Sequence, residues 1–166
     1  MSPDKQLELA EVEAIARELA STFGLEIVSF IFHGQGRHSQ LRIDIDRAGP
    51  AGVNLADCET FSRAFDARLE ASGLLDATYE LQVSSPGIDR PIRSPDDLRR
   101  SSGRPVRVEF RDEAGKAREA RGVLAWDPGT DTATVDGESG EVHVPRDRIL
   151  LMKQEVRPSG RKRNGA

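Results

Sequence analysis

The sequence predicts an α+β protein with two domains: an N-terminal α/β sandwich over residues 1–91, and a small closed β-barrel with its linker over residues 92–156. The sandwich is predicted because two segments of helical periodicity and three of strand periodicity share the first domain. The barrel is predicted because five short strand-like segments, separated by turn sequences, fill about 50 residues of the second domain. Residues 157–166 are rich in Pro, Ser, Gly and basic side chains, a composition typical of a disordered tail.

Two amphipathic helices are predicted in the first domain, over residues 3–23 and 55–71. Ser2 and Asn54 are the expected N-caps, because each side-chain oxygen can accept a hydrogen bond from the first helical turn. Both helices are expected to cover one face of a three-stranded sheet. Their apolar stripes are Leu7, Val12, Ile15, Ala16, Leu19 and Phe23 in the first helix, and Leu55, Cys58, Phe61, Ser62, Phe65 and Leu69 in the second.

Three strands are predicted for this sheet, over residues 25–33, 40–46 and 79–84. The first carries apolar side chains on both faces, which favours a central strand that is partly covered on both sides. The second alternates sharply and places Asp44 and Asp46 on a solvent face. Paired carboxylates also suggest a metal or acid–base site, but no His or Cys joins them at ligand spacing, so a solvated acidic face is expected.

The second domain is predicted to begin with a linker, residues 92–103, that holds one short helical turn from Ser94. Only two aromatic side chains, Phe110 and Trp126, occur in the strands and turns that follow. The five strands are expected over residues 105–110, 119–125, 132–135, 141–144 and 149–152.

The net charge of −4 is divided unequally along the chain. Residues 1–89 hold 7 basic and 15 acidic side chains, a net charge of −8, whereas residues 90–166 hold 17 basic and 13 acidic ones, a net charge of +4. The division favours partners of opposite charge for the two halves. A solvated surface whose balance drifts by chance is the alternative.

No catalytic constellation is visible in the sequence. The three histidines are scattered, and Ser84 and Ser85 lack the glycine flanks of a nucleophile elbow. Cys58 is a lone cysteine on an apolar helix stripe, so a small core residue is expected there. We therefore predict that the protein is not an enzyme and that it has no cofactor and no metal. No signal peptide or membrane span is expected, and the single cysteine suits a reducing cytoplasm.

The most distinctive stretch is residues 84–91, which read Ser-Ser-Pro-Gly-Ile-Asp-Arg-Pro and follow the third predicted strand. Proline donates no hydrogen bond to a strand ladder and glycine permits a positive φ, so the strand is expected to stop here. Such a stiff stretch with charges at fixed places suits a joint between two domains, or a surface that a partner reads. This interdomain or partner motif comprises Ser84, Ser85, Pro86, Gly87, Asp89, Arg90 and Pro91.

This run resembles the signature of the bacterial ribosome maturation factor RimP family, and the similarity extends along the chain from about Leu7 to Lys153. The chain has Ile88 and Ile92 where the family usually has Leu, and Leu98 where an aromatic residue is frequent. The resemblance implies that the barrel is SH3-like. It also implies an assembly factor rather than an enzyme.

The function expected from the resemblance is that of a cytoplasmic, monomeric factor that binds the immature small ribosomal subunit and assists its assembly. The expected partners are ribosomal RNA and a basic small-subunit ribosomal protein near the decoding centre, for which Asp44 and Asp46 are candidate contacts. A free-standing RNA-binding module that acts through the barrel is the alternative. The candidate RNA contacts are Arg93, Arg99, Arg100, Arg104, Arg161, Lys162 and Arg163.

Overall fold

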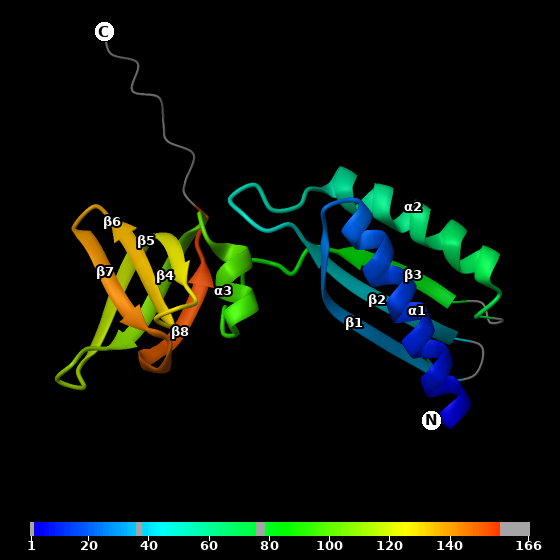
Figure 1. Ribbon diagram of the computed structural model, residues 1–166, viewed down its shortest axis with the longest axis horizontal. Coiled ribbons are helices and arrows are strands. Elements are labelled where there is room, and N and C mark those ends of the chain that lie inside the picture. Colours follow the sequence, from blue (N-terminus) through cyan, green and yellow to red (C-terminus); the bar gives the residue numbers. More distant parts are fainter. Residues whose placement is uncertain (1, 36–37, 76–78, 157–166) are drawn as a thin grey trace, which may run out of the picture. The chain divides into compact units, whose positions relative to one another are not determined.

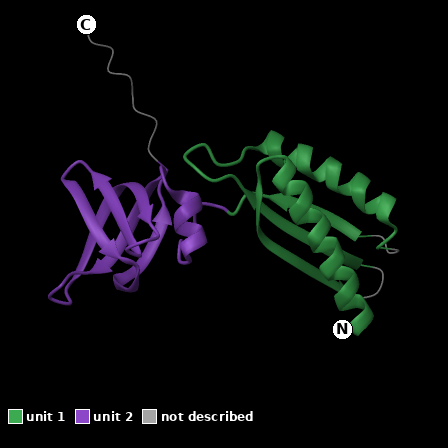
Figure 2. Ribbon diagram, viewed as in Figure 1, with its two compact units in different colours: residues 1–86 green, residues 87–166 purple. Residues whose placement is uncertain are grey.

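The structure, a computed structural model, describes residues 2–35, 38–75 and 79–156 of the chain. It has the predicted α+β class and divides into two compact units, Met1–Pro86 and Gly87–Ala166 (Figure 2). The predicted domain boundary at Pro91 lies inside the second unit. The predicted basic tail, with Arg161, Lys162 and Arg163, lies outside the described residues.

Unit 1 is a three-stranded sheet with two helices on one face (Figure 1). The strand order is β1-β2-β3, in which β1 pairs antiparallel and β3 pairs parallel with the central β2. The return from β2 to the parallel strand β3 runs through α2, as a parallel connection requires. The elements are α1 (Pro3–Thr22), β1 (Glu26–Gln35), β2 (His38–Asp46), α2 (Leu55–Ser72) and β3 (Tyr79–Ser84).

The core of unit 1 lies between the helices and the sheet, as the two apolar stripes predict. Leu41, Ile43 and Ile45 of β2 are fully buried against side chains of both helices. The N-caps Ser2 and Asn54 are confirmed, and Asn54 forms a reciprocal capping box with Asp57. The predicted stripes are wrong at their ends, which lie outside the core: Leu7 is 66 %, Phe23 38 % and Leu55 75 % exposed.

The prediction that the first strand is central is wrong, because β1 is an edge of the sheet. Its register with β2 shifts between Ile27 and Ser29, which marks a β-bulge. A bulge adds one residue and so reverses which alternate side chains face the core. Before it Ile27 faces the core, and after it Phe30 and Phe32 do. The bulge therefore brings Ile27, Phe30 and Phe32 onto one core-facing side, whereas Ile31 lies on the other side and is 39 % exposed.

Unit 2 is a five-stranded antiparallel sheet preceded by one short helix (Figure 1). The strand order is β7-β6-β5-β4-β8, and no ladder among the described residues joins β7 to β8. The prediction of a closed barrel is therefore not confirmed, since the ladders leave two edge strands. The elements are α3 (Pro95–Ser101), β4 (Pro105–Arg111), β5 (Ala117–Asp127), β6 (Thr132–Gly137), β7 (Gly140–Pro145), the 3₁₀ helix η1 (Arg146–Arg148) and β8 (Ile149–Gln154).

The long strand β5 pairs with two different strands along its length. Residues 117–123 pair with β4, and residues 123–127 pair with β6. Two glycines stand where the partner changes, and the backbones approach closely there. A Cβ atom on Gly122 would lie 2.2 Å from the carbonyl oxygen of Asp136, and one on Gly137 would lie 2.2 Å from that of Arg121. Only glycine fits at these two positions.

The segment predicted as a linker, residues 92–103, is an integral part of unit 2. Ile92 and Leu98 are buried in the second core, beside Val106, Leu124 and Met152. The amide of Ile92 also donates a 2.8 Å hydrogen bond to the carbonyl oxygen of Met152 in β8. The segment therefore begins the second fold, and its helix is longer than the predicted single turn because α3 covers apolar surface of the sheet.

Candidate functional site

The motif of residues 84–91 begins as the last residue of β3 and continues as a tight turn. Gly87 has φ +34°, and a Cβ atom at this position would have no neighbour within 4 Å, so the backbone conformation alone favours glycine there. The amide of Arg90 donates to the carbonyl oxygen of Gly87 over 3.3 Å and closes the turn. Ser85, Gly87, Asp89 and Arg90 are exposed, as a surface that a partner reads must be.

Ser84 is tied to the neighbouring strand by its side chain. Its hydroxyl donates a 2.8 Å hydrogen bond to Oδ1 of Asp44, and the hydroxyl of Ser29 donates one of the same length to Oδ2. Arg42 adds a 3.3 Å contact to Oδ1. Because Ser29, Asp44 and Ser84 stand opposite one another in adjacent strands, one carboxylate joins all three strands of unit 1.

The expected solvent exposure of Asp44 and Asp46 is wrong. Asp44 is 8 % and Asp46 6 % exposed, although both side chains point away from the apolar core. Their hydrogen bonds explain how the carboxylates tolerate this burial: hydroxyl groups satisfy Asp44, and the backbone amide of Arg47 donates to Asp46 over 2.8 Å. The role of the two residues as contacts for a basic protein stays a prediction.

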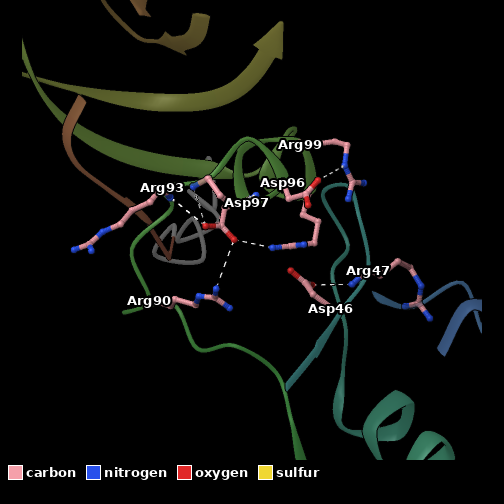
Figure 3. Close-up of polar contacts among 9 residues, drawn as sticks. Asp46, Arg47, Arg90, Arg93, Asp96, Asp97 and Arg99 are labelled. Atoms are coloured by element: carbon pink, nitrogen blue, oxygen red, sulfur yellow. Dashed lines mark hydrogen bonds and ion pairs between the residues drawn. The ribbon is translucent and has the colours of Figure 1, made fainter. Parts of the chain in front are cut away.

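Asp97, the third residue of α3, is the centre of the charged cluster in unit 2 (Figure 3). Its Oδ2 atom accepts hydrogen bonds from the amides of Arg93 and Ser94, at 3.2 and 3.1 Å. Its Oδ1 atom accepts from Nη2 of Arg100 at 2.7 Å and lies 3.7 Å from Nη2 of Arg90. One carboxylate therefore caps the helix, and it also pairs with an arginine of the helix and with the motif arginine.

The surroundings of Asp97 keep it ionised. Burial alone would raise the pKa of this carboxyl group, but the hydrogen bonds from the Ser94 and Arg93 amides and the Ser94 hydroxyl, with the nearby charge of Arg90, outweigh burial. The net effect lowers the pKa of Asp97 below its ordinary value of 3.8. The carboxylate is therefore negative at neutral pH, when it holds the two arginines.

The four described arginines among the predicted RNA contacts fall into two groups. Arg93 and Arg99 are exposed, and Figure 3 shows the guanidinium of Arg93 turned away from Asp97. Arg100 and Arg104 are buried, with 8 % and 6 % exposed, so both offer little surface to RNA, and their role as RNA contacts stays a prediction. For Arg100 the reason is its 2.7 Å ion pair with Asp97, which holds the side chain against its own helix.

The contact of Asp97 with the motif was not predicted from the sequence, which indicated only a favourable charge at a helix start. The signal was available: Ser94-Pro95-Asp96-Asp97 has the spacing of a capping box, which places an acidic side chain beside the preceding residues. Ser29 was missed because the change of core-facing positions that the bulge causes also fits a strand with apolar side chains on both faces.

Within residues 2–35, 38–75 and 79–156, no group of three or more His, Cys, Asp or Glu side chains has a geometry that could hold a metal ion. None of the described helices is long and apolar enough to cross a membrane. Cys58 is buried in the first core, as predicted, and burial raises the pKa of its thiol.

The fold and site thus define a two-unit α+β protein whose distinctive polar groups lie at the end of β3 and the start of α3. Comparison with known proteins agrees with this division. The family model described as the RimP N-terminal domain matches residues 15–89. The Ribosome maturation factor RimP of Microcystis aeruginosa (strain NIES-843 / IAM M-2473) is 40 % identical over 111 residues, which cover 66 % of this chain and 70 % of that protein.

The chain therefore belongs to the RimP family. The resemblance noted from the motif is confirmed, and the family is one of ribosome maturation factors, not of enzymes.

Proposed function

We propose that this protein is a ribosome maturation factor that binds the immature small ribosomal subunit and assists its assembly. Membership of the RimP family carries the proposal, and the division of charge along the chain supports it. Residues 1–86 hold 7 basic and 14 acidic side chains, a net charge of −7, whereas residues 87–166 hold 17 basic and 14 acidic ones, a net charge of +3. The basic excess of residues 87–166 comes from the tail, since residues 87–156 hold 13 basic and 14 acidic side chains and residues 157–166 hold 4 basic and no acidic ones. Unit 1 therefore suits a basic partner, and the tail suits an acidic one.

Unit 2 is proposed to lie against ribosomal RNA. Its exposed arginines near the motif, Arg90, Arg93 and Arg99, are the candidate phosphate contacts. Arg100 and Arg104 are buried and are proposed to support that surface rather than touch RNA. Arginine suits this role because its planar fork matches two phosphate oxygens.

Unit 1 is proposed to hold a basic small-subunit ribosomal protein near the decoding centre, as the family resemblance suggests. Exposed carboxylates of α1, such as Glu11 and Glu18, supply the larger part of the attraction. The candidates named from the sequence, Asp44 and Asp46, expose little surface. They remain candidate contacts only through the small part of each side chain that is exposed, which for Asp44 lies next to Arg42.

An SH3-like fold is proposed for unit 2. Five antiparallel strands, of which one long strand takes part in two successive ladders, suit a small strongly curved sheet. We further propose that the protein acts as a monomer in the cytoplasm.

The alternative, a free-standing RNA-binding module, is less well supported. Single-stranded RNA is commonly bound by bases stacking on exposed aromatic side chains. Phe110 and Trp126, the aromatic side chains of unit 2, both pack against the second core and are only partly exposed. Unit 2 therefore offers phosphate contacts but no stacking platform among its described residues.

A pull-down tests the proposed function. Tagged full-length protein is incubated with a bacterial cell extract, washed at low ionic strength, and the bound particles are separated by sedimentation and identified. The expected result is enrichment of small subunits and their precursors over large subunits. Equal recovery of both subunits, or recovery of RNA without ribosomal proteins, would contradict the proposal.

A further inference from the structure

The two oxygen atoms of Asp97 have separate tasks. Oδ2 is occupied by the amides of Arg93 and Ser94, which it holds at the start of α3. Oδ1 faces the guanidinium groups of Arg90 and Arg100. Helix capping therefore depends on one oxygen and the arginine contacts on the other.

The two arginines share Oδ1 unequally. Arg100 is close, at 2.7 Å, and its side chain is 10 % exposed. Arg90 is at 3.7 Å, beyond hydrogen-bond distance, and its side chain is 41 % exposed. Asp97 stays paired with Arg100 and both amides if Arg90 leaves. The Arg90 contact is thus the one in this cluster that can be exchanged at small cost.

We propose that Asp97 holds the Arg90 guanidinium ready for ribosomal RNA, and that a backbone phosphate of the RNA replaces the carboxylate as the partner of Arg90. Arg90 is the phosphate-binding residue, and Asp97 is a positioning residue that acts through it. This inference rests on the proposed RNA contact of unit 2, and it names the chemical group and the side chain that make the contact.

The chemistry of the cluster favours exchange with a phosphate. The nearby charges of Asp97, Arg90 and Arg100 sum to one positive charge, so an anion is attracted. The guanidinium of Arg90 now has one carboxylate oxygen of Asp97 at 3.7 Å. A phosphate can instead accept two hydrogen bonds from the same guanidinium. The amides at the start of α3 take no part, because Ser94 Oγ and Asp97 Oδ2 already accept from them.

The salt dependence of RNA binding tests Arg90 directly. Full-length protein is titrated with protein-free small-subunit ribosomal RNA at several salt concentrations. The logarithm of the affinity falls linearly with the logarithm of the salt concentration, and each lost phosphate contact makes this slope shallower by about 0.7 to 0.9. We expect Arg90→Ala to make the slope shallower by the amount of one phosphate contact. At low salt, it should also lower the affinity for RNA roughly tenfold. Arg90→Lys should keep the slope but lower the affinity for RNA a few-fold. Lysine keeps the positive charge but lacks the planar guanidinium that can donate two hydrogen bonds to a phosphate.

The control is Arg63→Ala, which removes the same charge from an exposed position on α2 in the acidic unit. It is expected to leave the slope unchanged, because unit 1 is not proposed to touch RNA, and a charge without a phosphate contact adds only to the overall field. An Arg90→Ala slope equal to that of wild type overturns the inference.

A double-mutant cycle tests whether Asp97 acts through Arg90. Asp97→Asn keeps an oxygen for the two amides but removes the charge that holds the Arg90 guanidinium in place. We expect it to lower RNA affinity about threefold in the wild-type background and to have no effect in the Arg90→Ala background. A rise in affinity, or an equal change in both backgrounds, means a general charge effect and overturns the positioning role. Asp97→Asn also removes the charged partner of Arg100. If this variant does not fold, the salt dependence of RNA binding by the Arg90 variants alone tests the inference.

The outcome for wild-type protein separates this inference from the proposed function. If the wild-type protein binds small subunits but Arg90→Ala leaves the salt dependence of RNA binding unchanged, the proposed function is retained and the inference is refuted. Wild-type protein that binds neither small subunits nor ribosomal RNA refutes both.

Discussion

The hydroxyl of Ser84 donates a 2.8 Å hydrogen bond to the carboxylate of Asp44, which joins the first residue of the family motif to the central strand of unit 1. Ser29 binds the other oxygen of the same carboxylate from the opposite strand. The motif is thus anchored at its start by a polar contact across the sheet, before the backbone turns at Gly87.

The first prediction concerns this anchor. Asp44→Ala should lower the free energy of unfolding by about 2 kcal/mol, because it leaves two partly buried hydroxyl groups without their acceptor. Thermal and urea unfolding followed by circular dichroism measure the loss. Ser85→Ala, a change of the exposed neighbour in the motif, is the control and should stay within about 0.5 kcal/mol of wild type. Equal free energies of unfolding for the two variants would show that the contacts of Asp44 do not stabilise the protein.

The second prediction concerns the close backbone approach in unit 2. Gly122→Ala should destabilise unit 2 by about 3 kcal/mol or more, because the new methyl group would lie 2.2 Å from a carbonyl oxygen of the next strand. Trp126, the single tryptophan of the chain, reports unfolding of this unit by fluorescence. Gly129→Ala is the control, since a methyl group there meets only the flexible Asp127 side chain, at 3.2 Å. A cooperative transition at the wild-type position in Gly122→Ala would contradict the prediction.

The third prediction concerns Tyr79, the single tyrosine of the chain. Burial first, and then the 2.9 Å hydrogen bond to Asp66, raise its pKa from about 10 to about 12. Because the folded value lies above the unfolded one, this group's contribution to stability is fully present below pH 10 and is lost as the pH rises toward 12. Phenolate absorbance near 295 nm should therefore stay flat through about pH 10 while the circular dichroism remains native.

Asp66→Asn provides the control for Tyr79. It removes the negative charge that opposes ionisation, so the phenol should ionise at lower pH than in wild type. A midpoint near pH 10 in folded wild-type protein would refute the assignment of Tyr79 to a partly buried, hydrogen-bonded site.

The fourth prediction concerns salt. Attachment of the protein to small subunits should weaken steadily as salt rises, because both proposed contacts are between opposite charges. Co-sedimentation at a series of salt concentrations measures it, with the isolated protein checked for folding at each. Attachment that is as strong at high salt as at low salt would argue for an apolar contact instead.

The fifth prediction concerns the division of labour between the units. Residues 1–89 contain the whole first core and all three strands of the first sheet, so this fragment is expected to fold. It should bind the basic ribosomal protein but not protein-free ribosomal RNA, because its net charge of −8 repels phosphate. If the fragment with residues 87–166 alone captured the ribosomal protein fully, the proposed roles of the units would be reversed.

Much of this protein was determined by local sequence. The helices α1, α2 and α3 begin where Ser2, Asn54 and Ser94 predict, since a capping side chain acts on the turn beside it. The alternation of Leu41, Ile43 and Ile45 predicts a strand with one buried face. The motif identified the family, because a long run of specific residues needs no three-dimensional information to be recognised.

Only the tertiary structure decided which strand is central and which charges are buried. Periodicity cannot reveal the bulge after Ile27, because the register depends on how β1 pairs with β2. An exposed aspartate and a buried one look the same in sequence, so the burial of Asp44 could not be read from spacing. The i,i+3 spacing of Asp97 and Arg100 suits a pair on one helix, but only the fold shows that Arg90 approaches the same oxygen. The contacts of Asp44 join residues that are 15 and 40 positions apart, and folding alone brings such residues together.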